Sequence, residues 1–390
     1  MSAFGEALET HPELSAGVLE QLLRGLVRIP SVNPNEAELA AHVVELLERT
    51  TAATVHVVET LPGRPSIAAV LGSGPGTSLV LNGHLDTVPV DDPGRWTVDP
   101  FGGEVRGGAL YGRGACDMKA GLAVQIAVAQ ALSSKHLKGR LVLHFAVGEE
   151  CAEPGTASLL EAGFGGDLGI TCEPTDLQVG VATRGLVHVR VRLVGRSGHA
   201  SRPASCANPL GALASVLTEA SAYEASLSSL EHPLLPPPSC TPTMVRAGVK
   251  ENSVPDECEL VLDRRLLPGE SLGQAVATLE ARLRSVVPAE IELTVSSVTR
   301  GFEPSEIAAS SSFAARLAHA VTELGGQPCA LVGMPYASDV SELILGGGIE
   351  AVTFGPGSAA FTHCADERVP LAQVQLAAQA ITRVALELLA

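Results

Sequence analysis

The feature that most constrains the fold is an alternation of two kinds of apolar segment along the first 180 residues. Strand-length apolar runs occupy residues 79–83, 140–147 and 167–172, and helical patterns occupy residues 118–132 and 156–163. Strands separated by helices imply crossover connections, which are typical of a parallel sheet. The sequence therefore predicts an α/β domain with a mostly parallel sheet and helices on both faces.

The pattern changes near residue 184, where the segment GLVHVRVRL alternates apolar and polar side chains. This period of two is typical of a strand in a sheet with one buried face and one solvated face. The other predicted elements of this region are helices at about 207–228 and 271–286 and strands near 243–249, 257–265 and 290–297. The resulting order β-α-β-β-α-β is the split βαβ unit, a ferredoxin-like α+β arrangement.

The length of the chain favours two domains, because 390 residues exceed one ordinary domain. We expect residues 184–297 to form the small α+β domain as an insertion. The larger α/β domain then comprises residues 1–183 and 298–390, since a helical pattern resumes near residue 310.

Composition and charge narrow the possible partners and location. The formal net charge of −17 is spread along the chain and argues against nucleic acid and anionic membranes, which require a positive surface. The eight cysteines form no CxxC pair, so neither a disulfide framework nor a zinc finger is predicted. The N-terminal segment MSAFGEALETHPE has no apolar signal region, and no apolar stretch reaches the roughly 18 residues of a membrane span. We therefore expect a cytoplasmic protein.

Residue types that bind metal ions follow several of the predicted strands. The motifs are GHLDTVP at 83–89, GRGACDMK at 112–119, GEE at 148–150, CEPT at 172–175, and GPG at 355–357 followed by THC at 362–364. Each has an ordinary explanation when taken alone: Asp117 precedes a helix as a capping residue does, and Glu149 and Glu150 resemble a solvated helix start. In open α/β sheets, however, ligands bind beyond the carboxyl ends of the strands. Two histidines and at least three carboxylates at such positions predict a site for zinc or a similar divalent ion.

These motifs, the last of which continues as THCADE at 362–367, resemble in their order and spacing those of a metallopeptidase family. Its members include aminoacylases, acetylornithine deacetylases, succinyl-diaminopimelate desuccinylases and glutamate carboxypeptidases, and the resemblance covers nearly the whole chain. It implies two divalent metal ions, Zn²⁺ in the first place and Co²⁺ or Mn²⁺ as alternatives. By this resemblance His84 and Glu173 bind one ion, and Glu150 and His363 bind the other. Asp117 bridges the two ions.

The resemblance also implies roles for residues beside the ligands. Glu149 is the general base, which takes a proton from water and later passes it to the leaving amine. Asp86 accepts the second imidazole proton of His84 and so fixes the ring, with a simple turn residue as the ordinary alternative. In the family the peptide bond between Asp117 and Met118 is cis.

The inserted domain is implied to act as a lid that handles the substrate. In the segment SGHAS, His199 resembles the lid histidine that polarises the scissile carbonyl, with an ordinary surface histidine as the alternative. In many relatives this histidine reaches the active site of another subunit, so the resemblance implies a homodimer formed through the lid. Asn252 and Arg265 match positions that hold substrate oxygens in relatives. Arg264 competes with Arg265, and structural salt bridges are an alternative for both arginines.

Further stretches favour one branch of the family. Residues 92–96, 172–178 and 263–269 are most similar to acetylornithine deacetylases. The expected function is hydrolysis of a small N-acyl amino acid. The alternatives are a metallo-dipeptidase or carboxypeptidase, whose substrate is a dipeptide or peptide, and a succinyl-diaminopimelate desuccinylase. A non-catalytic binding protein of the same fold is more distant, because it should lack a ligand or the base.

Three positions depart from the pattern of the family. Gly148 stands where many relatives have an acidic residue before the glutamate pair, and Ala120 replaces a glycine. Cys364 follows His363 where threonine or serine is more usual. None of these changes removes a ligand or the base, so we expect them to affect the support of the metals rather than the type of reaction.

Overall fold

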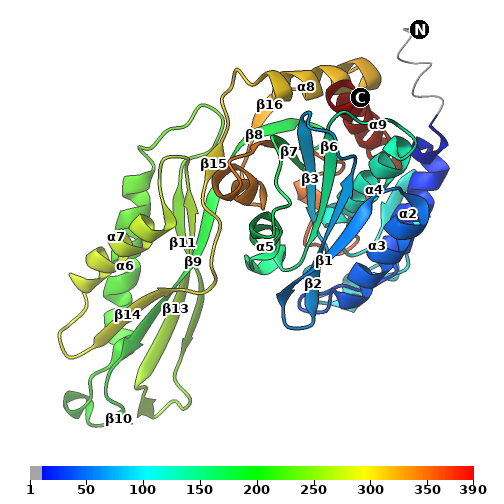
Figure 1. Ribbon diagram of the computed structural model, residues 1–390. Helices are drawn as coiled ribbons and strands as arrows, with labels where there is room; N and C mark the ends of the chain where they lie inside the picture. The colour runs from blue at the N-terminus through cyan, green and yellow to red at the C-terminus, as the bar shows by residue number, and fades with distance from the viewer. Residues whose placement is uncertain (1–10) are drawn as a thin grey trace. The chain divides into compact units, whose positions relative to one another are not determined.

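The computed structural model describes residues 11–390, which form two compact units (Figure 1). The first unit contains the chain up to Val181 with Glu306–Met334 and Ser338–Ala390, and the second contains Ala182–Ser305 and Pro335–Ala337. The predicted absence of an export signal concerns a segment whose first ten residues lie outside the described residues. No described helix is both long enough and apolar enough to span a membrane.

The first unit is built on one large mixed sheet with the strand order β1-β2-β6-β3-β7-β17-β8-β15, in which β16 also pairs with β8. The strands are β1 (Thr54–Leu61), β2 (Arg64–Leu71), β3 (Ser78–His84), β6 (Arg140–Ala146), β7 (Leu168–Thr171), β8 (Val179–Thr183), β15 (Ser305–Glu306), β16 (Leu331–Met334) and β17 (Glu350–Thr353). Neighbours are parallel from β6 through β3 and β7 to β17, whereas β1, β2 and β8 pair in the antiparallel direction. The predicted parallel sheet is confirmed at its centre, and antiparallel strands flank it.

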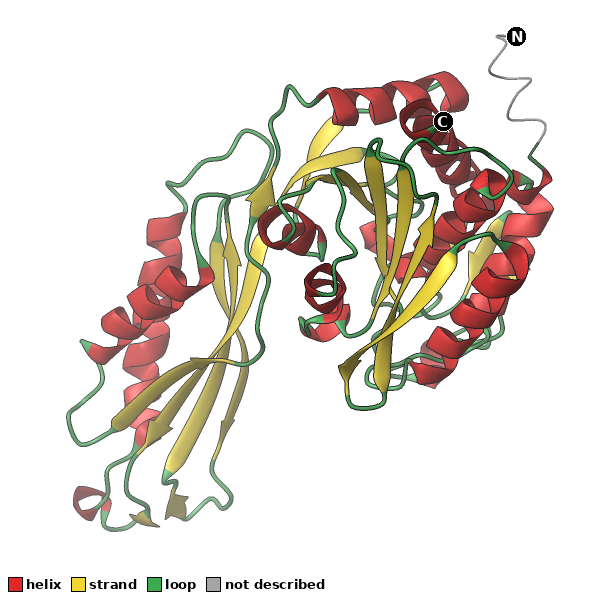
Figure 2. Ribbon diagram, in the orientation of Figure 1, coloured by secondary structure: helices red, strands yellow, loops and turns green. Residues whose placement is uncertain are grey.

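Helices cover both faces of this sheet because its central strands are apolar on both sides. In β3, Leu79 and Leu81 join the core on one face, and Val80 joins a cluster on the opposite face that includes Leu160 of α5. The helices of the first face are α2 (Ala16–Val27), α3 (Ala37–Thr50), α4 (Ala120–Leu132), α8 (Ser312–Gly325) and α9 (Leu371–Leu389), and α5 (Gly155–Glu161) covers the other. Figure 2 shows the helices in red beside the yellow sheet. The predicted α/β class is confirmed.

The segment before α4 differs from the predicted helix, which was expected to begin at Met118. Residues Ala115–Lys119 form a π-type turn, in which Asp117 and Met118 have non-helical φ and ψ angles and share a cis peptide bond. Backbone N–H groups of this turn donate to the carboxylate of Glu367 instead of extending the helix. The helix α4 therefore begins at Ala120, two residues later than its apolar pattern predicts.

The second unit contains an antiparallel sheet ordered β11-β13-β9-β14, covered on one face by α6 and α7. Its elements are β9 (Gly185–Val194), α6 (Pro209–Leu227), β11 (Ser239–Ala247), β13 (Glu257–Leu266), α7 (Leu272–Arg284) and β14 (Glu292–Ser297). Val187, Val189 and Val191 of β9 are buried against the helices. Arg190 and Arg192, which alternate with these apolar residues, pair with glutamates of β13 on the other face. The predicted split βαβ order is confirmed.

Candidate metal centre

Two histidines and four carboxylates of the first unit converge at one edge of the large sheet. Three strand ends and two further segments supply them: His84 ends β3, Glu149 and Glu150 follow β6, Glu173 follows β7, Asp117 precedes α4, and His363 follows β17. Because β6, β3, β7 and β17 are parallel neighbours, their carboxyl ends lie at the same edge of the sheet. The topology therefore gathers residues that are far apart in the sequence.

The carboxylate of Asp117 lies between the two histidines. Its Oδ1 is 3.2 Å from Nε2 of His84, and its Oδ2 is 3.2 Å from Nε2 of His363. Each carboxylate oxygen thus faces a different imidazole. A carboxylate in this position can be shared by two neighbouring metal ions.

Two glutamates complete a ligand group on each side of Asp117. Oε1 of Glu173 is 3.6 Å from Nε2 of His84, and Oε2 of Glu150 is 3.1 Å from Nε2 of His363. Each side therefore offers one imidazole nitrogen and carboxylate oxygens. This mixture of nitrogen and oxygen donors suits zinc and similar divalent ions.

Glu149 also lies beside His84, farther away than Glu173 does. Its Oε2 is 3.9 Å from Nε2 of His84. The groups His84–Glu149–Glu173 and His84–Asp117–Glu150 each place one ligand atom per residue within 4.8 Å of one another. By distance alone, Glu149 could bind a metal ion or act on a water molecule beside it.

Burial and mutual repulsion disfavour negative charge on the glutamates. Burial raises the pKa of Glu149, Glu150 and Glu173, and neighbouring carboxylates add to the effect. Hydrogen bonds to Asp117 and Glu150 raise the pKa of His363 to about 10. The site thus favours added positive charge. Four ionised carboxylates carry four negative charges, which two divalent cations would balance, so the residues present fit a pair of metal ions.

The contacts of Asp86 differ from the expectation. Nδ1 of His84 lies 2.9 Å from the backbone oxygen of Asp86, whereas the nearest carboxylate oxygen is 3.6 Å away. The carboxylate instead accepts hydrogen bonds from the backbone N–H groups of Gly148, Glu149 and Glu150. Because β3 and β6 are neighbours, a short side chain after β3 reaches the loop after β6. Asp86 holds the imidazole through its backbone and the glutamate loop through its side chain.

Glu367 supports Asp117 and was not predicted from the sequence. Its buried carboxylate accepts hydrogen bonds from the N–H groups of Gly114, Cys116 and Asp117 and pairs with Arg113 at 2.6 Å. Burial raises the pKa of Glu367 to about 7, against the lowering effect of Arg113. Its signal in the sequence is its place at the end of the motif THCADE, for which no role was predicted, and no spacing rule relates residues 250 positions apart.

Asp339 is a second buried acid that was not predicted. Its Oδ2 accepts a hydrogen bond of 2.6 Å from Oγ1 of Thr156, which accepts one of 2.7 Å from Nδ2 of Asn82. Burial raises the pKa of Asp339 to about 7, and its charge contributes to the raised pKa of Glu149. It follows the short strand β16, which the sequence pattern does not indicate, so no motif marks this position.

The residues predicted in the second unit fall into two places. His199 in the short strand β10 (Gly198–His199) lies beside Asn252, because the N–H of Ala200 donates to the backbone oxygen of Asn252. Arg265 lies near the end of β13, a strand that begins after Asn252 and rises by about 3.3 Å per residue. Asn252 and Arg265 are therefore at opposite ends of this strand. Within the described second unit they do not form one site.

Both candidate arginines have structural partners. Arg265 donates to the carboxylate of Asp263 with hydrogen bonds of 2.8 and 3.1 Å. Arg264 donates to Glu270 and Tyr223. The side chain of Arg264 is 1% exposed and that of Arg265 is 26% exposed, so of these two only Arg265 is accessible to a substrate.

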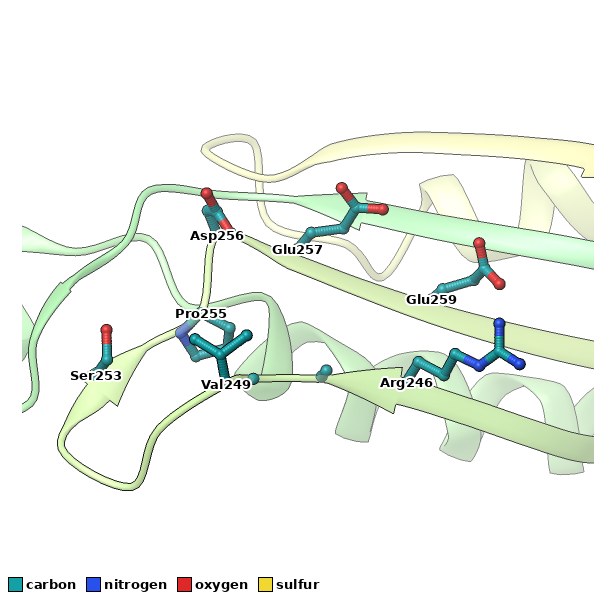
Figure 3. A pocket seen from close by; sticks show the side chains of 9 residues that line it. Arg246, Val249, Ser253, Pro255, Asp256, Glu257 and Glu259 are labelled. Atoms are coloured by element: carbon teal, nitrogen blue, oxygen red, sulfur yellow. The ribbon is translucent and has the colours of Figure 1, made fainter.

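A separate pocket of about 310 Å³ lies on the second unit (Figure 3). Its walls come from β11, the turn after β11, the short strand β12 (Ser253–Val254) and the start of β13. Figure 3 shows Arg246 beside Glu259, with the carboxylates of Asp256 and Glu257 farther along. The pocket has no imidazole, and both glutamates pair with arginines of β9. It therefore offers a poorer metal site than the sheet edge.

Comparison of the sequence with known proteins gives one family and several relatives. The model of peptidase family M20/M25/M40 matches residues 80–387. A Pyrobaculum aerophilum protein named as a LysW-lysine/LysW-ornithine hydrolase is 30% identical over 93% of this chain and 95% of its own. A succinyl-diaminopimelate desuccinylase of Wolinella succinogenes is 30% identical over 95% and 98%. An acetylornithine deacetylase of Proteus mirabilis is 31% identical over 65% and 68%.

Comparison of the structure gives the same fold. The metallo-carboxypeptidase Sso-CP2 of Sulfolobus solfataricus superposes with a TM-score of 0.80 and 18% sequence identity, over 94% of this chain and 98% of that one. The match extends over almost the full length of both chains, so it includes the inserted unit as well as the large sheet.

Proposed function

The chain belongs to peptidase family M20/M25/M40 and is a metal-dependent amidohydrolase, and on this premise we propose that it removes the acyl group from a small N-acyl amino acid. The observation that carries the proposal is the carboxylate of Asp117, whose two oxygens face His84 and His363. A pair of divalent ions at such a carboxylate is a common device for attacking an amide carbonyl with water.

We assign two ligand groups to the two ions. His84 and Glu173 would hold one ion, Glu150 and His363 would hold the other, and Asp117 would be shared by both. The separations of 3.1 to 3.6 Å between these groups support the assignment. Zn²⁺ is the proposed metal, because it binds imidazole and carboxylate together, with Co²⁺ and Mn²⁺ as alternatives.

We assign the general base to Glu149. When bound, the two ions supply Lewis acidity that polarises the scissile carbonyl and lowers the pKa of water. Glu149 accepts the proton of the attacking water and passes it to the leaving amine. Three features support this role: the residue is buried, burial raises its pKa, and its backbone N–H is held by Asp86. Its Oε2 is 3.9 Å from Nε2 of His84, whereas Oε1 of Glu173 is 3.6 Å away, so Glu173 is the nearer carboxylate to His84.

The names of the relatives share one kind of amino acid. They refer to lysine, ornithine and diaminopimelate, and each of these amino acids carries two amino groups. The names combine them with LysW, acetyl or succinyl. We therefore propose an N-acyl diamino acid as substrate, with acetylornithine as the first compound to test. Removal of a succinyl group is the second candidate, since the desuccinylase matches 95% of this chain. The non-catalytic alternative is set aside because every predicted ligand and the base are present.

The second unit is proposed to act as a lid and to form a homodimer. We propose that His199 polarises the scissile carbonyl, in its own subunit or in a partner subunit. Its exposure at the short strand β10 supports a role outside its own unit. Arg265, being partly exposed, is the proposed anchor for the substrate carboxylate, and Asn252 is proposed to hold a substrate oxygen.

A hydrolysis screen tests the proposed function. The purified protein is stripped of metal, reloaded with Zn²⁺, Co²⁺ or Mn²⁺, and assayed on N-acetyl and N-succinyl amino acids and on dipeptides. We expect hydrolysis only after reloading, with the highest kcat/KM on an N-acyl diamino acid. Undiminished activity in the stripped protein, or hydrolysis of dipeptides alone, would contradict the proposal.

A further inference from the structure

Glu153 occupies the space beside Gly148 that a side chain at residue 148 would fill. Gly148 has φ of +80°, and a Cβ built there would lie 2.2 Å from Oε2 of Glu153. The backbone joins the same two residues, since the N–H of Glu153 donates to the oxygen of Gly148 at 2.9 Å. A carboxylate oxygen of Glu153 thus lies next to the point where the side chain of a larger residue at position 148 would begin.

Asn33 links this carboxylate to Asp86. Nδ2 of Asn33 donates to Oε2 of Glu153 at 3.1 Å and to Oδ2 of Asp86 at 3.3 Å. One amide group can serve both acceptors, because it carries two N–H donors. Asp86 in turn accepts the N–H groups of the loop that carries Glu149 and Glu150. The contacts therefore run without a gap from Glu153 to the backbone of the glutamate pair.

The other side of Glu153 is anchored to the scaffold. NH2 of Arg64, at the start of β2, lies 2.7 Å from Oε2 of Glu153. The same guanidinium donates two hydrogen bonds, of 2.8 and 2.5 Å, to Glu36, whose side chain is fully buried at the start of α3. Because Arg64 is held between two carboxylates, it fixes the position of Glu153. A side chain fixed in this way can hold Asn33 in one orientation.

We propose that Glu153 is a positioning residue for the metal centre. It supplies the carboxylate that Gly148 cannot carry, and it acts through Asn33 and Asp86 to fix the loop of Glu149 and Glu150. This inference rests on the proposed roles of those two glutamates in metal binding and proton transfer. It predicts that Glu153 acts on turnover and metal affinity, and not only on the stability of the fold.

The test uses the full chain in four forms. Glu153→Ala removes the carboxylate, and Glu153→Gln keeps an acceptor oxygen without the charge. Gly148→Asp is made alone and together with Glu153→Ala, since aspartate tolerates a left-handed backbone better than most residues. Glu161→Ala is the matched control, because Glu161 is an exposed glutamate at the end of α5.

The expected results separate positioning from packing. Glu153→Ala lowers kcat and metal affinity by about tenfold, the lower end of the effects known for groups that support metal ligands, and leaves KM within about twofold. Glu153→Gln lowers kcat and metal affinity by less than Glu153→Ala does. Gly148→Asp is harmful alone, because its Cβ meets Glu153, but it restores most of the lost kcat when residue 153 is alanine. Hydrogen exchange of the amides of Gly148 to Glu150 quickens in Glu153→Ala, and the control leaves every readout unchanged.

Two outcomes overturn the inference. One is a Glu153→Ala protein that melts earlier but keeps the kcat and metal affinity of the parent below its melting range. The other is a failure of Gly148→Asp to restore kcat in the alanine background. Failure of the proposed function is distinguishable, because the parent protein would then hydrolyse none of the substrates. Metal titration and amide exchange would still report whether Glu153 holds the loop.

Discussion

The proposed metal centre of the first unit and the short strand β10 of the second unit, which carries His199, differ in how firmly their side chains are held. At the proposed metal centre, His84 is 1% exposed and Glu173 is 4% exposed, and buried acceptors hold the neighbouring backbone, whereas the side chain of His363 is 50% exposed. His199 is exposed, and the hydrogen bonds of its ring are to the backbone and hydroxyl of Ser201. Metal ligands must be held in place, whereas a residue that meets the substrate can be free beforehand. Substitutions in the two regions should therefore change different quantities.

The largest effect is expected at the proposed base. Glu149→Gln keeps the size of the side chain but cannot accept a proton, so kcat should fall by about 10²–10⁴-fold. Metal content should stay at the parent level, because Glu149 is not among the proposed ligands. Steady-state kinetics and metal analysis check both points, with Glu161→Gln as the control. A variant within tenfold of the parent kcat would refute the base assignment.

The next largest effect is expected at His199 of the second unit. His199→Ala should lower kcat by about 10²–10³-fold, the typical cost of losing one group that stabilises an oxyanion. Metal affinity should change less than twofold, because His199 is absent from both ligand groups. His319→Ala, at an exposed histidine of α8, serves as the control. An unchanged kcat would show that His199 is an ordinary surface residue.

A smaller effect is expected where the metal centre depends on buried support. Asp86→Ala removes the acceptor of three backbone N–H groups and should lower metal affinity and kcat together by about 10–100-fold. Isothermal titration with Zn²⁺ and steady-state kinetics measure the two quantities. If kcat alone fell and metal affinity stayed at the parent value, Asp86 would act as His199 is expected to act. The proposed difference between the two regions would then be wrong.

The stability of the metal-free protein should depend on pH in the opposite sense to ordinary acid denaturation. The pKa of His363 is raised from 6.5 to about 10, so its contribution is present below pH 6.5 and is lost as the pH rises to about 10. The raised pKa of Glu149, Glu150 and Glu173 acts in the same direction. The melting temperature of the chelator-treated protein should therefore fall across this range.

Bound metal ions should remove this dependence. At about one hundred times its dissociation constant, a ligand stabilises the folded state by about 2.7 kcal/mol, which corresponds to a rise in melting temperature of about 3–5 °C for a protein of this size. Thermal scans at pH 6.5 and 9 with metal or chelator measure the difference. Equal pH profiles with and without metal would contradict the electrostatic account of the site.

Much of the fold and part of the site follow from local sequence patterns. The alternation of strand and helix predicts the parallel centre of the sheet, and the alternation in β9 predicts the second sheet. His84, Glu149 and Glu173 could be proposed because they follow predicted strands whose ends meet when the strands are parallel. The roles of Asp117 and His363 came from the family resemblance, since neither follows a strand directly.

The supporting residues could not be predicted because tertiary contacts alone bring them to the site. Glu367 reaches Asp117 across 250 positions, and Glu153 meets Asn33 across 120. The sequence predicts that the side chain of Asp86 contacts the imidazole of His84, but it accepts hydrogen bonds from the loop after β6. This contact forms because β3 and β6 are neighbouring strands. Arg265 could be placed on a strand from its sequence, but its pairing with Asp263 depends on side-chain positions.

The central claim is that the carboxylate of Asp117 joins two metal ions. The most direct measurement is the number of metal ions bound per chain, determined by metal analysis after dialysis, in the parent protein and in Asp117→Ala. We expect two ions in the parent, and a variant that loses at least one of them while remaining folded by circular dichroism. One ion or none in the parent, or two ions retained by the variant, would contradict the account.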